Sequence, residues 1–267
     1  MLTFTKMNGA GNDFVMLDNR DGKLALDKAQ IARLCDRHRG IGADGVLVVE
    51  PAQNSANFRM RYYNADGGEA EMCGNGARCF GRFAQRVSGQ QGDISFETMA
   101  GVITAQFVGG NVRIQMSEPH SLCLNNALEV AGEKLTVHSL NTGVPHAVVC
   151  VDELEKVEVR KLGAALRYHP HFAPKGTNAN FMQKMGAQSL AIRTYERGVE
   201  DETLACGTGM VACAIVFHEL TGAPSPVAVK VRGGETLEIG FRQDGAVYRD
   251  VTLTGPADFV FDGQVAV

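Results

Sequence analysis

The chain has 267 residues, of which 45% are hydrophobic and 21% charged, with a formal net charge of −4. This length suits two compact domains, and the slightly acidic balance favours neither a nucleic acid nor a membrane surface as partner. The opening residues lack the apolar run of a signal peptide, and no apolar stretch is long enough to span a membrane. We therefore expect a cytoplasmic protein whose seven cysteines remain thiols.

The first predicted helix begins after Asp27, a residue type that caps helix N-termini, and runs through His38. The segment 40–45 follows it and matches the G-x-G-x-x-G pattern of dinucleotide-binding proteins. That pattern requires a strand before it and a helix after it, whereas here the order is reversed, so no Rossmann site is expected. The segment 58–62 alternates apolar and polar residues, which predicts a half-buried strand.

Two longer helices are predicted over 73–87 and 206–220, and each opens with a glycine-rich turn. Apolar residues lie on several faces of both, which indicates helices buried inside a sheet. We predict strands for the remaining apolar segments.

The two helices belong to a longer internal repeat. CGNG at Cys73 is echoed by CGTG at Cys206, about half the chain away, and RYYNADGGEAEMCGNG aligns with RTYERGVEDETLACGTG. GNDFVMLD and GVPHAVVCVD match near the start of each half, and strand-like segments follow each helix. The repeat predicts an α/β fold of two pseudo-symmetric duplicated domains, each a mixed β-sheet wrapped around a central helix. We expect one domain over 1–117, completed by a strand over 257–267, and the other over 118–256.

A cysteine at a helix N-terminus lies in the positive field of the helix, which lowers its pKa and makes thiolate available. The glycines beside it let a carboxylate approach the unpaired N–H groups. Two such turns facing one cleft would place two thiols on opposite sides of a substrate carbon. Inverting a carbon next to a carboxylate needs that arrangement, because one base removes a proton while an acid delivers one to the other face.

Other uses of the cysteines are less well supported. We predict that five of them fill buried space, namely Cys35, Cys79, Cys123, Cys150 and Cys213. A zinc site is not expected, because the spacings of Cys73 to Cys79 and Cys206 to Cys213 are wider than the usual knuckle. A thiol redox or metal-binding protein remains the alternative from a different class, although the chain has no C-x-x-C motif.

The motifs GAGNDF, NADGGEAEMCGNGARC, NTGVPHAVV, TNANF and YERGVEDETLACGTG together resemble the diaminopimelate epimerase family. The resemblance extends from about residue 3 to the C-terminus. It implies an enzyme that interconverts LL- and meso-diaminopimelate without pyridoxal phosphate, metal or other cofactor, in the synthesis of lysine and peptidoglycan precursors. Members of this family are often dimers, so a homodimer is expected.

The resemblance also implies roles for individual residues. Cys73 and Cys206 correspond to the catalytic cysteines, and His146 and Glu196 to the polar partners that set their protonation. The residues implied to bind substrate are Gly74, Asn75, Gly207, Thr208 and Asn12 at the reacting carboxylate, and Asn64, Asn178 and Arg197 toward the distal end, with Glu196 also implied to bind substrate.

The chain departs from some family members at two positions. Val144 stands where they carry Asn before the Pro-His pair, and Gly45 stands where they carry Gln. Both changes remove hydrogen-bonding groups from the expected distal pocket. A cofactor-independent racemase or epimerase of another amino acid on the same fold is therefore the nearest alternative.

Overall fold

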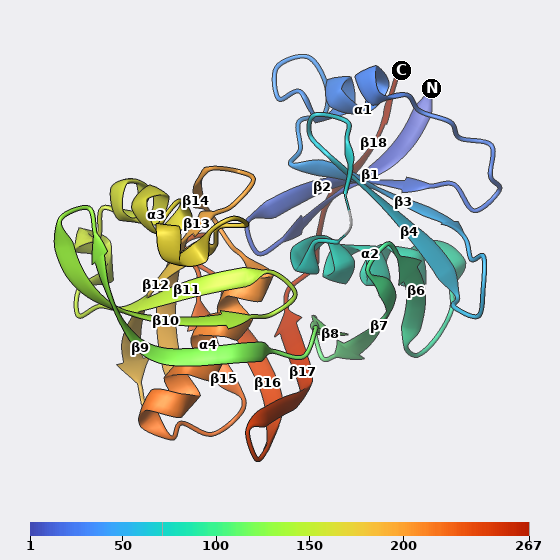
Figure 1. Ribbon diagram of the computed structural model, residues 1–267. Coiled ribbons are helices and arrows are strands. Elements are labelled where there is room, and N and C mark those ends of the chain that lie inside the picture. The colour runs from blue at the N-terminus through green and yellow to red at the C-terminus, as the bar shows by residue number, and fades with distance from the viewer. Residues whose placement is uncertain (71, 267) are drawn as a thin grey trace. The chain divides into compact units, whose positions relative to one another are not determined.

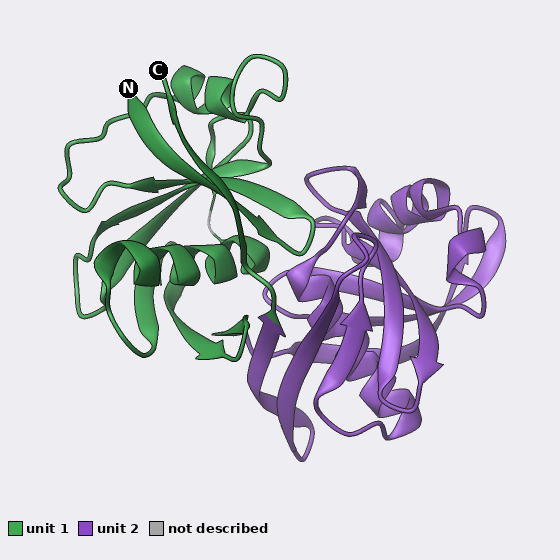
Figure 2. Ribbon diagram, turned by 180° about the vertical axis from the view of Figure 1, so that it is seen from behind, with its two compact units in different colours: residues 1–115, 255–267 green, residues 116–254 purple. Residues whose placement is uncertain are grey.

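The computed structural model describes residues 1–70 and 72–266 of the chain, which divides into two units. Unit 1 consists of Met1–Gln115 and Gly255–Val267, and unit 2 consists of Met116–Thr254 (Figure 2). The boundaries expected from the sequence lie two residues further along the chain in each case. None of the helices in the described part of the chain has the length and apolar character needed to cross a membrane.

Unit 1 is a mixed sheet whose strands are β1 (Leu2–Gly9), β2 (Asn12–Asp18), β3 (Gly45–Pro51), β4 (Phe58–Asn64), β5 (Glu69–Ala70), β6 (Ile94–Thr98), β7 (Gly101–Val108), β8 (Asn111–Gln115) and β18 (Asp258–Val265). The pairing order is β18–β1–β2–β3–β4–β6–β7–β8, with β5 attached to β4. The pairs β2–β3 and β4–β6 are parallel and the others antiparallel. Helix α1 (Lys28–Cys35) joins β2 to β3, and helix α2 (Gly74–Ser88) lies against strands β1–β4 and β6–β8 (Figure 1).

Unit 2 repeats this arrangement with strands β9 (His120–Val130), β10 (Glu133–Asn141), β11 (Pro145–Cys150), β12 (Asn178–Gly186), β13 (Ser189–Glu196), β14 (Asp201–Thr203), β15 (Val227–Lys230), β16 (Thr236–Asp244) and β17 (Val247–Gly255). The order is β9–β10–β11–β12–β13–β15–β16–β17, with β14 attached to β13 and parallel pairs at β11–β12 and β13–β15. Helix α4 (Gly207–Thr221) lies against β10–β13, β15 and β16. The duplicated mixed α/β fold predicted from the sequence is confirmed.

The central helices α2 and α4 have the same length and the same ends. Each has 15 residues, begins after a cysteine with extended backbone, and ends at a glycine in the left-handed region. The N–H of Gly89 bonds to Gln85 O at 3.0 Å, and that of Gly222 bonds to His218 O at 2.7 Å. A left-handed C-cap favours glycine, which carries no Cβ. Both helices start one residue later than predicted, because each cysteine is the N-cap.

Helix α1 begins as predicted but ends earlier. The Asp27 side chain accepts the Gln30 N–H at 2.8 Å while the Gln30 side chain accepts the Asp27 N–H at 2.9 Å, which forms a capping box. The helix stops at Cys35 because Asp36 has extended backbone, and the Asp36 side chain accepts the N–H groups of the next turn.

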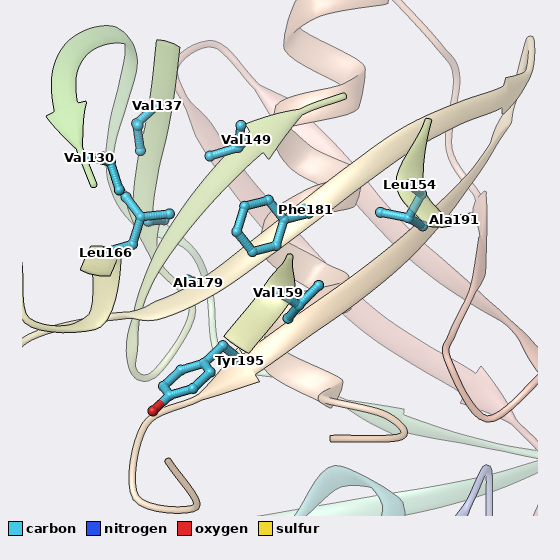
Figure 3. Close-up of a cluster of buried hydrophobic side chains, with 11 residues drawn as sticks. Val130, Val137, Val149, Leu154, Val159, Leu166, Ala179, Phe181, Ala191 and Tyr195 are labelled. Carbon is cyan, nitrogen blue, oxygen red and sulfur yellow. The ribbon is translucent and has the colours of Figure 1, made fainter. Parts of the chain in front are cut away.

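The prediction of strands for all remaining apolar segments is wrong at Val159–Arg167, which forms helix α3. The helix belongs to the connection from β11 to the parallel strand β12. That connection also contains the short 3₁₀ turns η1 (Leu154–Lys156) and η2 (Pro170–Phe172). Val159 and Leu166 on its inner face belong to one buried cluster with Phe181 of β12 (Figure 3). Parallel neighbours need a crossover of this kind.

The cluster predicts the effect of shortening one side chain of α3. Leu166 is fully buried, so Leu166→Ala is expected to lower the free energy of unfolding by about 2–5 kcal/mol. Lys161→Ala on the outer face of the same helix is the matched control, since that residue makes only a surface ion pair with Glu158, and a change within about 0.5 kcal/mol is expected. Urea unfolding of both variants measures the difference, and equal losses would contradict the assigned packing.

Candidate active site

The cysteines of the two CGxG turns have equivalent positions. Cys73 and Cys206 are the N-caps of α2 and α4, with φ/ψ of −131°/122° and −121°/109°. Their carbonyl groups accept the N–H of Ala77 at 2.7 Å and of Met210 at 2.9 Å. Neither side chain makes the capping hydrogen bond that Ser, Thr, Asp or Asn would make. The first N–H groups of both helices are therefore not used by an N-cap side chain.

The residues predicted from the sequence divide between the two units. Half-site 1 denotes the predicted residues of unit 1, which are Asn12, Asn64, Cys73, Gly74 and Asn75. Half-site 2 denotes those of unit 2, which are His146, Asn178, Glu196, Arg197, Cys206, Gly207 and Thr208.

In half-site 1 a chain of side-chain hydrogen bonds joins Asn75 to Asn12. The Asn75 amide donates to Asn12 Oδ1 at 2.6 Å, and Asn12 Nδ2 donates to Asp44 Oδ2 at 3.0 Å. Asn75 Oδ1 accepts a hydrogen bond from Arg78 at 3.0 Å. The structure thus brings together the two asparagines that the sequence assigned to the reacting carboxylate, and it fixes which end of each amide faces its neighbour.

Arg78 was not predicted from the sequence, although it belongs to the same motif. Its side chain is fully buried, and it donates to Gly74 O and to Pro256 O, each at 3.2 Å. Burial lowers the pKa of the guanidinium. A cation beneath the turn attracts an anion bound there. A helix-interior arginine among apolar residues was the signal that could have identified it.

Asn64 occupies a different place in unit 1. It ends β4, and its loop is closed by hydrogen bonds from Asn64 N–H to Gly68 O and from Gly67 N–H to Asn64 O, both 2.9 Å. Its side chain is exposed and makes no hydrogen bond to any residue that the structure describes. The structure does not join Asn64 to Asn12 and Asn75, so its side chain is available to a ligand.

Gly45 pairs with Asn64 across β3 and β4, and its lack of a side chain has a steric cause. A Cβ at Gly45 would lie 2.5 Å from Tyr63 O and 2.7 Å from a ring carbon of Tyr62. Real Cβ atoms do not approach so closely, so the Tyr62 ring takes the space that a longer side chain would need. Val144, the other departure, lies partly exposed in the turn before β11 and offers no polar side-chain atom.

In half-site 2, Asn178 ties together the ends of three strands. Its Nδ2 donates to Pro145 O at 3.0 Å, and its Oδ1 accepts the N–H of Arg197 at 2.9 Å. Asn178 is also the register partner of His146 in the parallel pair β11–β12. The Arg197 guanidinium donates to Lys175 O at 3.2 Å and forms no ion pair with any residue that the structure describes. A carboxylate could therefore take its remaining N–H groups.

Glu196 precedes the Cys206 turn in the sequence, and Thr208 belongs to the turn. A hydrogen bond holds each of them. Thr203 Oγ1 donates to Glu196 Oε2 at 2.9 Å, and burial raises the pKa of Glu196. Thr142 Oγ1 donates to Thr208 O at 3.0 Å, which links the β10–β11 turn to the start of α4. The Thr208 hydroxyl lies 3.6 Å from the sulfur of Cys206. Thr203 thus fixes the acid, while Thr142 and the Thr208 hydroxyl lie at the turn that carries the thiol.

His146 is buried and uncharged at neutral pH. Only 1% of its surface is exposed, and burial, followed by repulsion from Arg197, lowers its pKa to about 3. Its Nδ1 lies 3.1 Å from the amide nitrogen of Asn180. Among the described residues, Nε2 has no hydrogen-bond partner although no water reaches it. A buried donor or acceptor left open in this way is uncommon and calls for an explanation.

The other cysteines only partly follow the prediction. Cys35, Cys79 and Cys213 are buried, and desolvation raises the pKa of Cys79 to about 12, so these thiols stay protonated. Cys123 and Cys150 are exposed, so describing them as buried filler is wrong. Cys123 lies on the edge strand β9 and Cys150 is the last residue of β11. Within residues 1–70 and 72–266, no group of His, Cys, Asp or Glu is arranged to hold a metal ion.

Comparison with solved structures identifies the fold. The chain matches a phenazine biosynthesis protein of the PhzF family from Bacillus anthracis with a TM-score of 0.74 at 15% identity, covering 100% of this chain and 99% of that one. It matches a probable proline racemase from Agrobacterium radiobacter with a TM-score of 0.70 at 15% identity, covering 100% and 93%. At these identities the match defines a shared two-domain α/β fold and nothing further.

Comparison of sequences defines the family. The family model described as diaminopimelate epimerase matches residues 4–122 and 138–260. The chain is 45% identical to the diaminopimelate epimerase of Aquifex aeolicus, over 99% of this chain and 98% of that protein. It is 44% identical to that of a Hydrogenobaculum species, over 99% of each. The chain belongs to the diaminopimelate epimerase family.

The buried neutral state of His146 predicts a pH dependence of stability. Its pKa is about 3 in the folded protein against 6.5 ordinarily, so between these values the unfolded chain binds a proton that the folded protein does not. The stabilisation is complete above about pH 6.5 and is lost as the pH falls, by up to about 1.4 kcal/mol per pH unit. Urea unfolding at several pH values should show that the free energy of unfolding falls more steeply toward low pH for the wild type than for His146→Gln. Parallel pH curves for the two proteins would contradict the buried neutral imidazole.

Proposed function

We propose that this chain is an epimerase that interconverts LL- and meso-2,6-diaminopimelate by proton transfer at Cα, in lysine and peptidoglycan precursor synthesis. The observation that carries the proposal is the pair of equivalently oriented N-cap cysteines, Cys73 and Cys206, in a chain of the diaminopimelate epimerase family. One cysteine at a helix N-terminus suits many reactions. Two in duplicated units suit a reaction that exchanges a proton between the two faces of one carbon.

In the proposed reaction the two cysteines act in turn on the same substrate carbon. One cysteine, as thiolate, removes the Cα proton, and the electron pair of the broken C–H bond delocalises into the substrate carboxylate. The other cysteine, as thiol, then delivers its proton to the opposite face of Cα and becomes the thiolate. The products are the inverted carbon and a pair of cysteines with their protonation states exchanged. The reverse reaction starts from that state.

The charge that develops on the carboxylate would be stabilised by backbone N–H groups of Gly74-Asn75 and Gly207-Thr208. These groups lie at the N-termini of α2 and α4, where the helix dipole adds to their effect. The buried cation of Arg78 contributes in the same direction. We propose that these fixed dipoles and charges act in place of a cofactor as electron sink.

The polar partners and the distal contacts complete the proposal. His146 and Glu196 would set the protonation of the thiols, which their burial and their shifted pKa values support. Asn64, Asn178 and Arg197 would bind the distal amino-acid head of the substrate. Arg197 suits that task because its guanidinium can hold a carboxylate through two parallel hydrogen bonds. The pocket would do without polar side chains at Val144 and Gly45.

We also propose that the protein is a cytoplasmic homodimer. Reactive thiols persist in a reducing compartment, and the described residues contain seven free cysteines. Strand β18 supports the dimer, because within unit 1 it pairs with β1 alone and its Phe259, Val260 and Phe261 are 40–55% exposed. Unpaired strand edges with apolar side chains are suited to association.

The epimerase proposal predicts the fate of deuterium from the solvent. Under reducing conditions in D₂O, the wild type should convert LL-diaminopimelate to a meso product that carries deuterium at the inverted carbon. Cys73→Ser and Cys206→Ser should each lose epimerisation by at least about 10²-fold, because each removes one of two required acid/base groups. Mass spectrometry and stereoisomer analysis follow both quantities.

Cys150→Ser is the matched control, since Cys150 is an exposed thiol on β11 and should retain wild-type activity. Retained epimerisation in either catalytic variant would overturn the two-thiol mechanism. If the wild type inverts another amino acid and leaves diaminopimelate unchanged, the mechanism stands but the substrate assignment to Arg197 and the asparagines is wrong.

The dimer proposal predicts the effect of a charge on the exposed face of β18. Val260 is 55% exposed within the chain, so Val260→Lys should leave the fold intact while weakening association. Sedimentation velocity should show a dimer for the wild type and a larger monomer fraction for the variant. Val247→Lys on β17, 41% exposed in unit 2, serves as control and should sediment as the wild type. A monomeric wild type would contradict the proposal.

A further inference from the structure

Beneath the Cys206 turn, three buried polar side chains form one hydrogen-bonded chain. Thr194 Oγ1 on β13 donates to Asn180 Oδ1 on β12 at 3.0 Å. Asn180 Nδ2 lies 2.9 Å from Ala147 O and 3.1 Å from His146 Nδ1, both on β11. Asn180 is completely buried, and His146 and Thr194 are 1% and 2% exposed. Burying three polar groups without need would be costly, and here the described contacts satisfy all but one atom.

These contacts determine which nitrogen of His146 carries its proton. A backbone carbonyl can only accept, so the Asn180 atom facing Ala147 O must be the NH₂ group. Its second hydrogen is directed at His146 Nδ1, which must therefore present a lone pair. Because the ring is neutral, its single proton is on Nε2. That nitrogen is the buried atom without a partner among the described residues, so it is an N–H donor that awaits an acceptor.

The corresponding positions of unit 1 carry aromatic and aliphatic side chains in place of this polar chain. In unit 1, Leu47 of β3 lies opposite Tyr62 of β4 in the strand register. In unit 2, Asn180 of β12 lies opposite Thr194 of β13 in the same way. By the same registers, Phe14 pairs with Gly45 where His146 pairs with Asn178. Unit 1 thus has Phe14, Leu47 and Tyr62 at the places of His146, Asn180 and Thr194, and its Phe14 and Tyr62 rings pack edge to face at 6.2 Å.

The glycines of the two turns confirm the correspondence. A Cβ at Gly76 of CGNG would lie 3.2 Å from Leu47 Cδ1 and 3.4 Å from the Phe14 ring. A Cβ at Gly209 of CGTG would lie 2.4 Å from Asn180 Oδ1 and 3.3 Å from the sulfur of Cys206. Asn180 and the Cys206 thiol therefore lie against the same glycine. The polar chain belongs to the immediate support of the second turn.

We infer that Asn180 is a positioning residue that holds His146 as its Nε2–H tautomer, so that His146 acts in half-site 2 as a hydrogen-bond donor rather than as a base. The role in catalysis rests on the proposed function, since the acceptor of this N–H would be the Cys206 thiolate or the bound carboxylate. A thiolate that accepts a hydrogen bond is stabilised relative to the thiol. The tautomer itself follows from the contacts of Asn180 alone.

The tautomer can be measured without any assay of activity. In ¹⁵N-histidine-labelled protein under reducing conditions, long-range ¹H–¹⁵N spectra distinguish the protonated from the unprotonated ring nitrogen. His146→Gln assigns the resonances. The wild type should show a protonated Nε2 and an unprotonated Nδ1. His138 is the internal control, because its Nδ1 accepts the Asn125 N–H at 3.3 Å and should not respond to changes at Asn180.

Two variants separate positioning from packing. Asn180→Leu copies the residue of unit 1, so it should fold while leaving the tautomer of His146 unfixed. Asn180→Asp presents an acceptor in place of the donor, so it should move the proton to Nδ1. In both, kcat should fall about 10²-fold, as for the loss of one aligned hydrogen-bond donor, while KM changes by less than about 3-fold.

The outcomes distinguish this inference from the proposed function. A wild type with the proton on Nδ1 would overturn the inference even if diaminopimelate is epimerised, and so would an Asn180→Asp variant with an unchanged tautomer. If Asn180→Leu does not fold, the wild-type and Asn180→Asp spectra still decide. If the tautomer is as expected but diaminopimelate exchanges no deuterium, the inference stands for the tautomer and the proposed function fails.

Discussion

Each unit is organised around a 15-residue helix that packs against its sheet and begins directly after a cysteine. Every helix begins with N–H groups that lack a partner within the helix. An N-cap Ser, Thr, Asp or Asn side chain commonly accepts a hydrogen bond from one of them. Here Cys73 and Cys206 stand at that place and make no capping hydrogen bond. The glycines beside them keep the turn free of side chains. The proposed use of both helix starts is to bind an anion, which fits N–H groups that no N-cap side chain occupies.

The two units carry different kinds of side chain at corresponding positions beneath their turns. Beneath its turn, unit 1 packs the apolar side chains of Phe14 and Leu47, whereas unit 2 places His146 and Asn180 at the corresponding positions. Unit 1 has its polar network on the other side of the turn, from Asp44 through the asparagines to Arg78. Duplication therefore gave two scaffolds of one kind, and the side chains around each thiol diverged, as a pair of groups with opposite protonation states would require.

Much of this architecture could be predicted from the repeat, because matching motifs in the same order define two similar domains. The prediction missed helix α3 although Val159, Leu162 and Leu166 recur at helical spacing, because the segment is only nine residues long and has a glycine in its middle. The repeat itself held the information, because α1 makes the equivalent crossover in unit 1. For the site, the motifs predict which residues touch a substrate. Arg78 was missed although a helix-interior arginine is a visible signal, whereas Asn180 could not be identified because its partners His146, Ala147 and Thr194 are brought to it by the strand registers.

The pairing of β18 with β1 also affects the order in which the protein can fold. In unit 2 the corresponding strand, β9, directly precedes β10 and is joined to it by the turn of Ala131 and Gly132. In unit 1 that strand comes from residues 258–265, which follow all of unit 2 along the chain. During synthesis, unit 2 can therefore complete its sheet while unit 1, although made first, still lacks an edge. A chain permuted to place β18 before β1 would make both units continuous and would reverse this dependence.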